Sequence, residues 1–106
     1  MTNGTLKELN TLEEWIKGFV KEHTEYTYKR YDKETLSHPN WHQIVVYKNH
    51  KQIFDAVCHF GSYGYDLGLL EIMGDIVTNE DDGVEGYLTS QEVINKFLCW
   101  VNGDEV

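Results

Sequence analysis

The sequence contains a single proline, Pro39, and only two cysteines, Cys58 and Cys99. Two cysteines are too few for a disulfide framework, and their spacing is not that of a C-x-x-C motif. In a reducing compartment they would be free thiols or metal ligands. The sequence therefore gives no support to a disulfide-stabilised fold or to dithiol redox chemistry.

Long apolar runs are also missing. No stretch approaches the roughly 18 residues that a membrane-spanning helix needs, and residues 1–10 lack the cationic start and apolar run of a secretion signal. We therefore expect a soluble, intracellular protein. With 106 residues, of which 41% are hydrophobic, the chain can bury one core. We expect a single domain over residues 1–106, with residues 1–10 as a loose N-terminal leader.

Basic residues are scarce: nine Lys and Arg stand against 18 Asp and Glu, which gives a net charge of −9. The imbalance is concentrated in residues 71–106, which hold nine carboxylates and one lysine, a local charge of −8. Such a surface would repel a phosphate backbone, so direct nucleic-acid binding is disfavoured. It suits a cation, a basic protein surface, or a site that nucleic acid normally occupies.

Two helices are indicated by apolar residues that recur at three- and four-residue spacing. The first is predicted over residues 12–22, and Thr11 and Glu14 before and within it have the spacing of a capping box. The second helix is predicted to begin at Thr89, which has the same spacing to Glu92.

Segments rich in β-branched and aromatic residues predict a strand over residues 25–31 and a hairpin formed by 41–48 and 51–59. The two hairpin strands would be joined by a two-residue turn at Asn49-His50. Pairing Lys48 with Lys51 sorts the hairpin side chains into two faces. One face would hold Trp41, Val45, Tyr47, Phe54, Ala56 and Cys58, and the other His42, Ile44, Val46, Ile53, Val57 and His59. Both are largely apolar, so the hairpin should be central in its sheet and covered at least partly on both sides.

Residues 69–77 fit either a short helix or two strands interrupted at Gly74, and the 3.6-residue periodicity favours the helix. Residues 78–86 are expected to form an acidic loop. The predicted fold is therefore α+β: an N-terminal helix, an antiparallel sheet centred on the hairpin, and a C-terminal helix.

The first candidate site is a calcium loop. Residues 81–92 can be aligned with the twelve-residue EF-hand loop, with Asp81, Glu85 and Glu92 at ligand positions. Gly83 stands at a third ligand position and offers no side chain. The alternative is a solvent-exposed acidic loop in which Glu92 serves only to cap the following helix.

The second candidate site is a transition-metal site. His38, His42 and His59 could hold zinc, with Cys58 or Cys99 joining if the strand bends. The spacing matches no established zinc motif. The alternative is that both cysteines are ordinary small hydrophobic residues and the histidines ordinary strand residues.

The glycine- and tyrosine-rich run at 61–68 has neither G-x-G-x-x-G spacing nor a G-K-[ST] ending, and it contains no Lys or Arg. A protein-contact loop using Tyr63 and Tyr65 is favoured over a phosphate-binding loop. No nucleophile elbow, triad order or oxyanion-hole motif is present, so an enzyme is not predicted.

The run YGYDLGLLEIMGD at residues 63–75, followed by DGVEGYLT at 82–89 and a helix, resembles small acidic proteins encoded by phages and prophages of Gram-positive bacteria. The resemblance covers about the last half of the chain. It implies a compact single domain, made in the bacterial cytoplasm, whose partner is a host protein. Among such proteins, small acidic anti-CRISPR inhibitors occupy surfaces where a nuclease binds DNA or block movements that it needs.

We therefore expect an acidic protein-binding module that blocks a nucleic-acid-binding host enzyme in the manner of an anti-CRISPR inhibitor. Alternatives are a small metal-binding protein, with zinc or calcium as the ion, and an assembly subunit that forms homo-oligomers. Acidic contacts raise association rate and specificity more than affinity, so aromatic anchors should accompany them. The expected contact residues are Asp75, Glu80, Asp81, Asp82, Glu85, Asp104, Glu105, Tyr63, Tyr65 and Tyr87.

Overall fold

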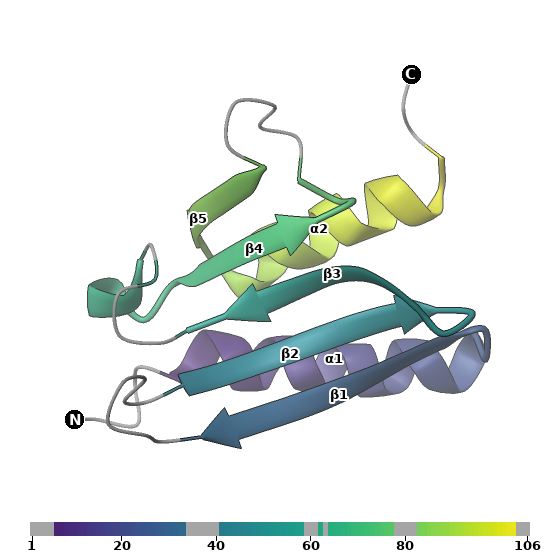
Figure 1. Cartoon of the computed structure of the whole chain (residues 1–106), viewed down its shortest axis with the longest axis horizontal. Coiled ribbons are helices and arrows are strands. Elements are labelled where there is room, and N and C mark those ends of the chain that lie inside the picture. The colour runs from purple at the N-terminus through teal and green to yellow at the C-terminus, as the bar shows by residue number, and fades with distance from the viewer. Residues whose placement is uncertain (1–5, 34–40, 59–61, 63, 78–82, 104–106) are drawn as a thin grey trace.

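The computed structural model describes residues 6–33, 41–58, 62, 64–77 and 83–103. In chain order its elements are α1 (Lys7–Glu22), β1 (Tyr26–Lys33), β2 (Trp41–Lys48), β3 (Lys51–Val57), the short 3₁₀ turn η2 (Tyr65–Leu67), β4 (Leu70–Gly74), β5 (Val84–Leu88) and α2 (Ser90–Val101). The strands form one five-stranded antiparallel sheet in the order β1-β2-β3-β4-β5. Both helices lie against the same face of this sheet (Figure 1). This is the predicted α+β fold.

The core fills the space between the two helices and the sheet. Phe97 of α2 lies near its centre, with ring centroids 5.1 Å from Phe19 of α1, 5.7 Å from Tyr26 of β1 and 5.3 Å from Phe54 of β3. Its side chain is 1% exposed. Around it pack the buried aliphatic side chains Leu9, Leu12, Ile16, Ile44, Val46, Leu70, Ile72, Val93 and Ile94.

Helix α1 begins at Lys7, so the predicted start at Thr11 is wrong and residues 7–10 do not belong to a leader. Leu9 is fully buried and extends the buried stripe of the helix by a turn. Thr11 therefore lies inside the helix, where its side chain is exposed. The helix carries no side-chain hydrogen bond at its N-cap.

Helix α2 begins as predicted. The backbone N–H of Glu92 donates to Thr89 Oγ1 at 3.2 Å, and the backbone N–H of Thr89 donates to Glu92 Oε1 at 2.8 Å. These reciprocal bonds form a capping box, which satisfies two amides that the helix start would otherwise leave unpaired.

The hairpin turn is confirmed, because Lys48 pairs with Lys51 and both turn residues, Asn49 and His50, have positive φ angles of 53° and 72°. The predicted faces are wrong beyond it. A bulge between Val46 and Tyr47 shifts the register by one residue, so that Val46 pairs with Phe54. The helix-covered face therefore holds His42, Ile44, Val46, Phe54, Ala56 and Cys58.

The opposite face of the sheet, called the open face below, is not covered by either described helix (Figure 1). Strands β2 and β3 are interior strands, as expected. The expected partial cover on both sides is also seen, since Val45 and Val57 on the open face are nearly buried although neither described helix covers them. By register, the open face carries Lys29, Tyr31, Trp41, Gln43, Val45, Tyr47, Asp55, Val57, Glu71, Met73 and Val84.

Residues 70–74 form a strand, which corrects the predicted helix over 69–77. Leu70 and Ile72 are buried against the helices, whereas Met73 is 47% exposed on the open face. Strand β5 begins at Val84, inside the predicted acidic loop, and residues 78–82 of that loop lie outside the described residues. Among the described helices none has the length and hydropathy to cross a membrane.

Candidate protein-binding surface

The segments at the β4–β5 edge of the sheet contain carboxylates but no basic residue. We call residues 64–77 and 83–88, which form η2, β4, β5 and the turns beside them, the acidic edge. It contains four acidic residues and no Lys or Arg. Those residues are Asp66, Glu71, Asp75 and Glu85. This part of the surface therefore favours a cationic partner.

The acidic edge also holds the exposed large hydrophobic side chains of the described chain. Leu67 of η2 is 70% exposed, Tyr87 of β5 is 60% exposed and Met73 of β4 is 47% exposed. Side chains of this kind, with carboxylates beside them, have the composition of an interface with apolar anchors and a polar rim.

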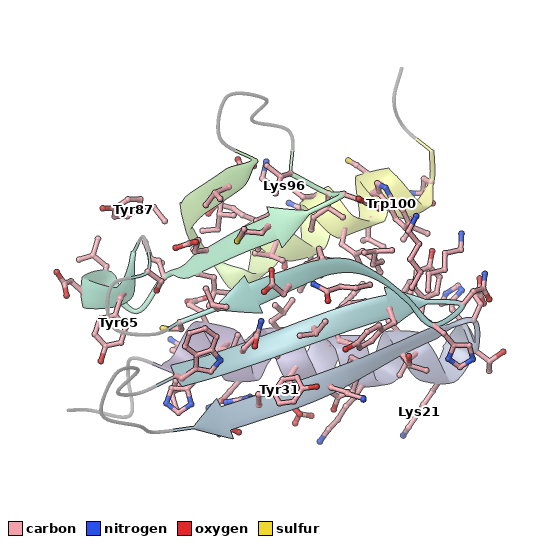
Figure 2. All side chains as sticks on the ribbon, in the orientation of Figure 1. Lys21, Tyr31, Tyr65, Tyr87, Lys96 and Trp100 are labelled. Atoms are coloured by element: carbon pink, nitrogen blue, oxygen red, sulfur yellow. The ribbon has the colours of Figure 1, made fainter. Side chains whose placement is uncertain are left out.

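A bulge in β5 determines how Tyr87 is presented. Leu88 pairs with Leu70 and Glu85 pairs with Ile72, so Gly86 and Tyr87 together face the single residue Glu71. Tyr87 adopts a left-handed backbone conformation with φ of 60°. Its side chain projects away from the sheet (Figure 2). The bulge therefore directs an aromatic ring outward at this end of the acidic edge.

The η2 turn packs directly against this bulge. Gly64 precedes the turn with φ of 99°, and a Cβ added there would lie 3.1 Å from both the backbone nitrogen and the Cα of Tyr87. The contact needs glycine because a side chain at position 64 would push Tyr87 away. Leu67 and Tyr87 are thus carried by two segments in contact.

Three of the predicted contact residues differ in what they can offer a partner. Asp75 is exposed at the end of β4, where its N–H donates to the carbonyl of Ile53 at 2.7 Å. Glu85 instead pairs with Lys96 of α2, with Oε2 2.9 Å from Nζ, so its carboxylate faces the helix. Tyr65 is half-buried and packs against the core. Apart from Tyr87, the other predicted contact residues lie outside the described residues; they are Tyr63, Glu80, Asp81, Asp82, Asp104 and Glu105.

The histidine and cysteine side chains are not gathered around one point in the part of the chain that the structure describes. His42 Nδ1 lies 2.7 Å from Asp32 Oδ1. Cys58 lies on the same face as His42, not the opposite one as predicted, because the bulge shifts β3. Its thiol is fully buried in the core, and this burial raises its pKa to about 11.

Within the described ranges, no group of three His, Cys, Asp or Glu is placed to hold a metal ion. The predicted zinc site also needs His38 and His59, which lie outside those ranges, and it stays a prediction. In the predicted calcium loop, Glu85 pairs with Lys96 and Glu92 caps α2, so both carboxylates have other partners.

The open face is a second surface, which the sequence reasoning did not find. Val45 and Val57 at its centre are only 5% and 6% exposed, although neither described helix covers them. Trp41 Nε1 donates to Gln43 Oε1 at 3.2 Å, and Gln43 Nε2 donates to Asp55 Oδ2 at 2.6 Å. Polar and aromatic side chains beside the valines are therefore linked to one another by hydrogen bonds.

The β1 side of the open face is aromatic and cationic. The ammonium of Lys29 lies 5.9 Å from the centroid of the Tyr47 ring. Burial and a neighbouring hydrogen-bonded hydroxyl, that of Tyr31, raise the pKa of Tyr47. Tyr31 lies over the β1–β2 part of the sheet in Figure 2. Strict alternation of side chains along β1 and β2 is enough to place Lys29, Tyr31 and Tyr47 on one face. The bulge reverses the faces of β3, so the sequence does not predict which β3 side chains lie beside them.

No protein-family model, curated protein or solved structure matches this chain.

Proposed function

We propose that this protein is an acidic protein-binding module that docks on a basic, nucleic-acid-binding surface of another protein and competes there with nucleic acid. The observation that carries the proposal is the coincidence of exposed apolar side chains with the acidic edge. Leu67, Met73 and Tyr87 lie in segments that contain carboxylates and no Lys or Arg. A basic surface that binds phosphates could therefore contact both the carboxylates and the apolar anchors of the acidic edge.

The two kinds of contact have separate roles. Exposed carboxylates such as Asp66 and Asp75 steer a basic partner and raise the association rate, and salt weakens their effect. Apolar anchors such as Tyr87 are desolvated in the complex and supply most of the affinity. The proposal therefore predicts salt-sensitive association and anchor-dependent dissociation.

The backbone at Tyr87 supports its role as an anchor. A left-handed conformation costs a non-glycine residue about 1–2 kcal/mol, and such strain is concentrated at functional sites in proteins. The ring makes no large contribution to the core, since it is 60% exposed. The bulge presents the ring in a fixed direction, so little freedom of the ring would be lost on binding.

The sequence resemblance supplies the biological setting of the proposal. It favours a phage- or prophage-encoded inhibitor that acts in the cytoplasm of a Gram-positive host, without catalytic activity of its own. The target class that fits an acidic competitor of nucleic acid is an RNA-guided nuclease, because these enzymes hold their heteroduplex in a positively charged channel. The inhibition would be anti-CRISPR-like.

The direct test is DNA cleavage by purified RNA-guided nucleases of Gram-positive bacteria, measured with increasing amounts of this protein. The expected result is inhibition of at least one nuclease, relieved by excess target DNA and weakened by added salt. Full cleavage by every nuclease, together with no binding to any of them, would contradict the proposal.

Matched variants separate the acidic edge from net charge. The double reversal Asp66→Lys with Asp75→Lys replaces two negative charges at the edge by two positive ones, a change of +4 in net charge, and it should weaken inhibition strongly. The control, Glu14→Lys with Glu22→Lys, makes the same change at exposed positions of α1. If the two double variants lose inhibition equally, the acidic edge is not the contact surface.

A further inference from the structure

The open face carries a charge pattern that is complementary to itself. The strand register places one residue from each strand side by side across the sheet, and this row reads Lys29, Val45, Asp55, Met73 and Val84. The adjacent row reads Tyr31, Gln43, Val57 and Glu71. The cation is therefore on β1, the apolar centre on β2 and β3, and the carboxylates on β3 and β4.

We propose that the open face is the interface of a homodimer, in which it packs against the open face of a second copy of this chain. A two-fold axis parallel to the strands, running between β2 and β3, lays β1 of one copy over β4 of the other. Lys29 then lies over Met73 of the second copy, between its Asp55 and Glu71. The symmetry creates this contact twice.

Two other face-to-face arrangements bring like charges together. An axis parallel to the strands but centred on β3 would place Asp55 over Asp55 of the second copy. An axis across the strands would place Lys29 over Lys29 of the second copy and Asp55 over its counterpart. Each juxtaposition is repulsive in a desolvated interface, so the charge pattern disfavours these two arrangements. An axis parallel to the strands and centred on β2 would place Lys29 over Asp55 of the second copy, but only three strands of each copy would then overlap. The axis between β2 and β3 overlaps four strands and gives Lys29 both carboxylates, so it is the favoured arrangement.

The side chains at the centre of the open face are already fixed in position. Val45 and Val57 are nearly buried, and the bonds from Trp41 to Gln43 and from Gln43 to Asp55 hold polar groups in fixed positions. Little side-chain freedom remains to be lost on association. Met73, which is 47% exposed, would gain cover from the aliphatic stem of Lys29.

The available area sets the expected strength. Four overlapping strands at about 4.8 Å spacing, each about seven residues long, give a contact of about 450 Å² per copy. The total of about 900 Å² is in the range of weak, transient interfaces. The dimer should therefore be reversible and depend on protein concentration. Strand β5 lies outside the overlap, so Tyr87 stays accessible in the dimer, whereas Met73 and Glu71 of the acidic edge would be covered. The inference does not rest on the proposed function.

Sedimentation of the full chain across a wide concentration range tests the proposal. The expected result for the wild type is a reversible monomer–dimer equilibrium. Lys29→Glu should raise the dimer Kd at least about tenfold, and Glu71→Lys should do the same. The combined swap, Lys29→Glu with Glu71→Lys, should restore most of the lost affinity because the pairs form again with opposite orientation.

Controls use the same charge changes away from the open face. Lys51→Glu, at the hairpin turn, and Glu22→Lys, at the end of α1, should change the dimer Kd by less than about twofold. Lys29 is exposed, so its reversal should not prevent folding, and a circular dichroism melt checks this. A chain that stays monomeric at every concentration would overturn the proposal, as would a dimer that ignores both reversals or a swap that restores nothing.

Discussion

The backbone of Gly74 lies so close to that of Ile53 that a Cβ added to the glycine would sit 2.4 Å from the Ile53 carbonyl oxygen. Gly74 also has φ of 123°, a conformation that side chains disfavour. Gly74→Ala should therefore lower the free energy of unfolding by about 3 kcal/mol or more, because it combines steric overlap with backbone strain. Urea unfolding followed by circular dichroism measures the loss.

Gly18 provides a control for this substitution. It lies in α1, and a Cβ added there would meet no atom within 4 Å. Gly18→Ala should raise the free energy of unfolding by about 0.5–1 kcal/mol, since alanine favours the helix. Equal effects at the two positions would show that Gly74 does not make the close contact.

The two sequence motifs that look like capping boxes should respond differently to alanine. Thr89 accepts a backbone hydrogen bond at the start of α2, so Thr89→Ala should cost about 1 kcal/mol. Thr11 lies inside α1 and is exposed, so Thr11→Ala should leave stability unchanged or raise it slightly. Thermal melts of both variants check the prediction, and a larger loss at Thr11 would place the start of α1 at that residue after all.

Asp32 should contribute an acid-dependent part of the stability. Burial alone would raise its pKa, but hydrogen bonds from His42 and Arg30 and the charge of Arg30 lower the pKa below its ordinary value of 3.8. A lowered carboxyl pKa stabilises the fold above the ordinary value, and this stabilisation is lost as the pH falls through the folded-state pKa.

In Asp32→Asn, the stability lost between neutral pH and about pH 3 should be smaller than in the wild type. The difference should be modest, because the Asp32 side chain is 50% exposed. Urea unfolding at the two pH values measures both proteins. If the acid loss is the same in the variant, the bonds from His42 and Arg30 do not stabilise the carboxylate in solution.

The two cysteines should differ sharply in reactivity. Cys58 is fully buried and burial raises its pKa to about 11, whereas Cys99 is exposed on α2. A thiol-specific disulfide reagent should therefore modify one thiol per native chain quickly, and the second only after unfolding. Cys99→Ser should remove the fast reaction. Rapid modification of both thiols in the native protein would mean that Cys58 is not in the core.

Local signals account for what the sequence predicted correctly. The capping box at Thr89 and Glu92 needs no distant contact, and the turn at Asn49-His50 follows from chain geometry. Helix α1 has no side-chain cap, so no local signal marks its start at Lys7. The start follows only from the burial of Leu9, which depends on packing.

The errors come from contacts between segments distant in the sequence. Leu70 and Ile72 fit a helix as well as a strand by spacing, and pairing with β3 decides in favour of the strand. The bulge beside Val46 has no local signature, yet it exchanges the faces of β3 and hides the open face. Tyr87 can be proposed as an anchor from the sequence alone. The exposure of Leu67 and Met73 depends on how the strands and the η2 turn pack, so these two anchors emerge only from the fold.

Tyr87 should show a conflict between stability and binding. Its left-handed backbone suits glycine, and its ring is 60% exposed, so Tyr87→Gly should raise the free energy of unfolding by about 1 kcal/mol. The same variant should lose inhibition of a sensitive nuclease, because the anchor is gone. Tyr87→Phe keeps the ring and should retain both the strain and most of the inhibition. A Tyr87→Gly protein that is less stable than the wild type would show that the ring supports the fold, and one that inhibits fully would remove Tyr87 from the proposed contact surface.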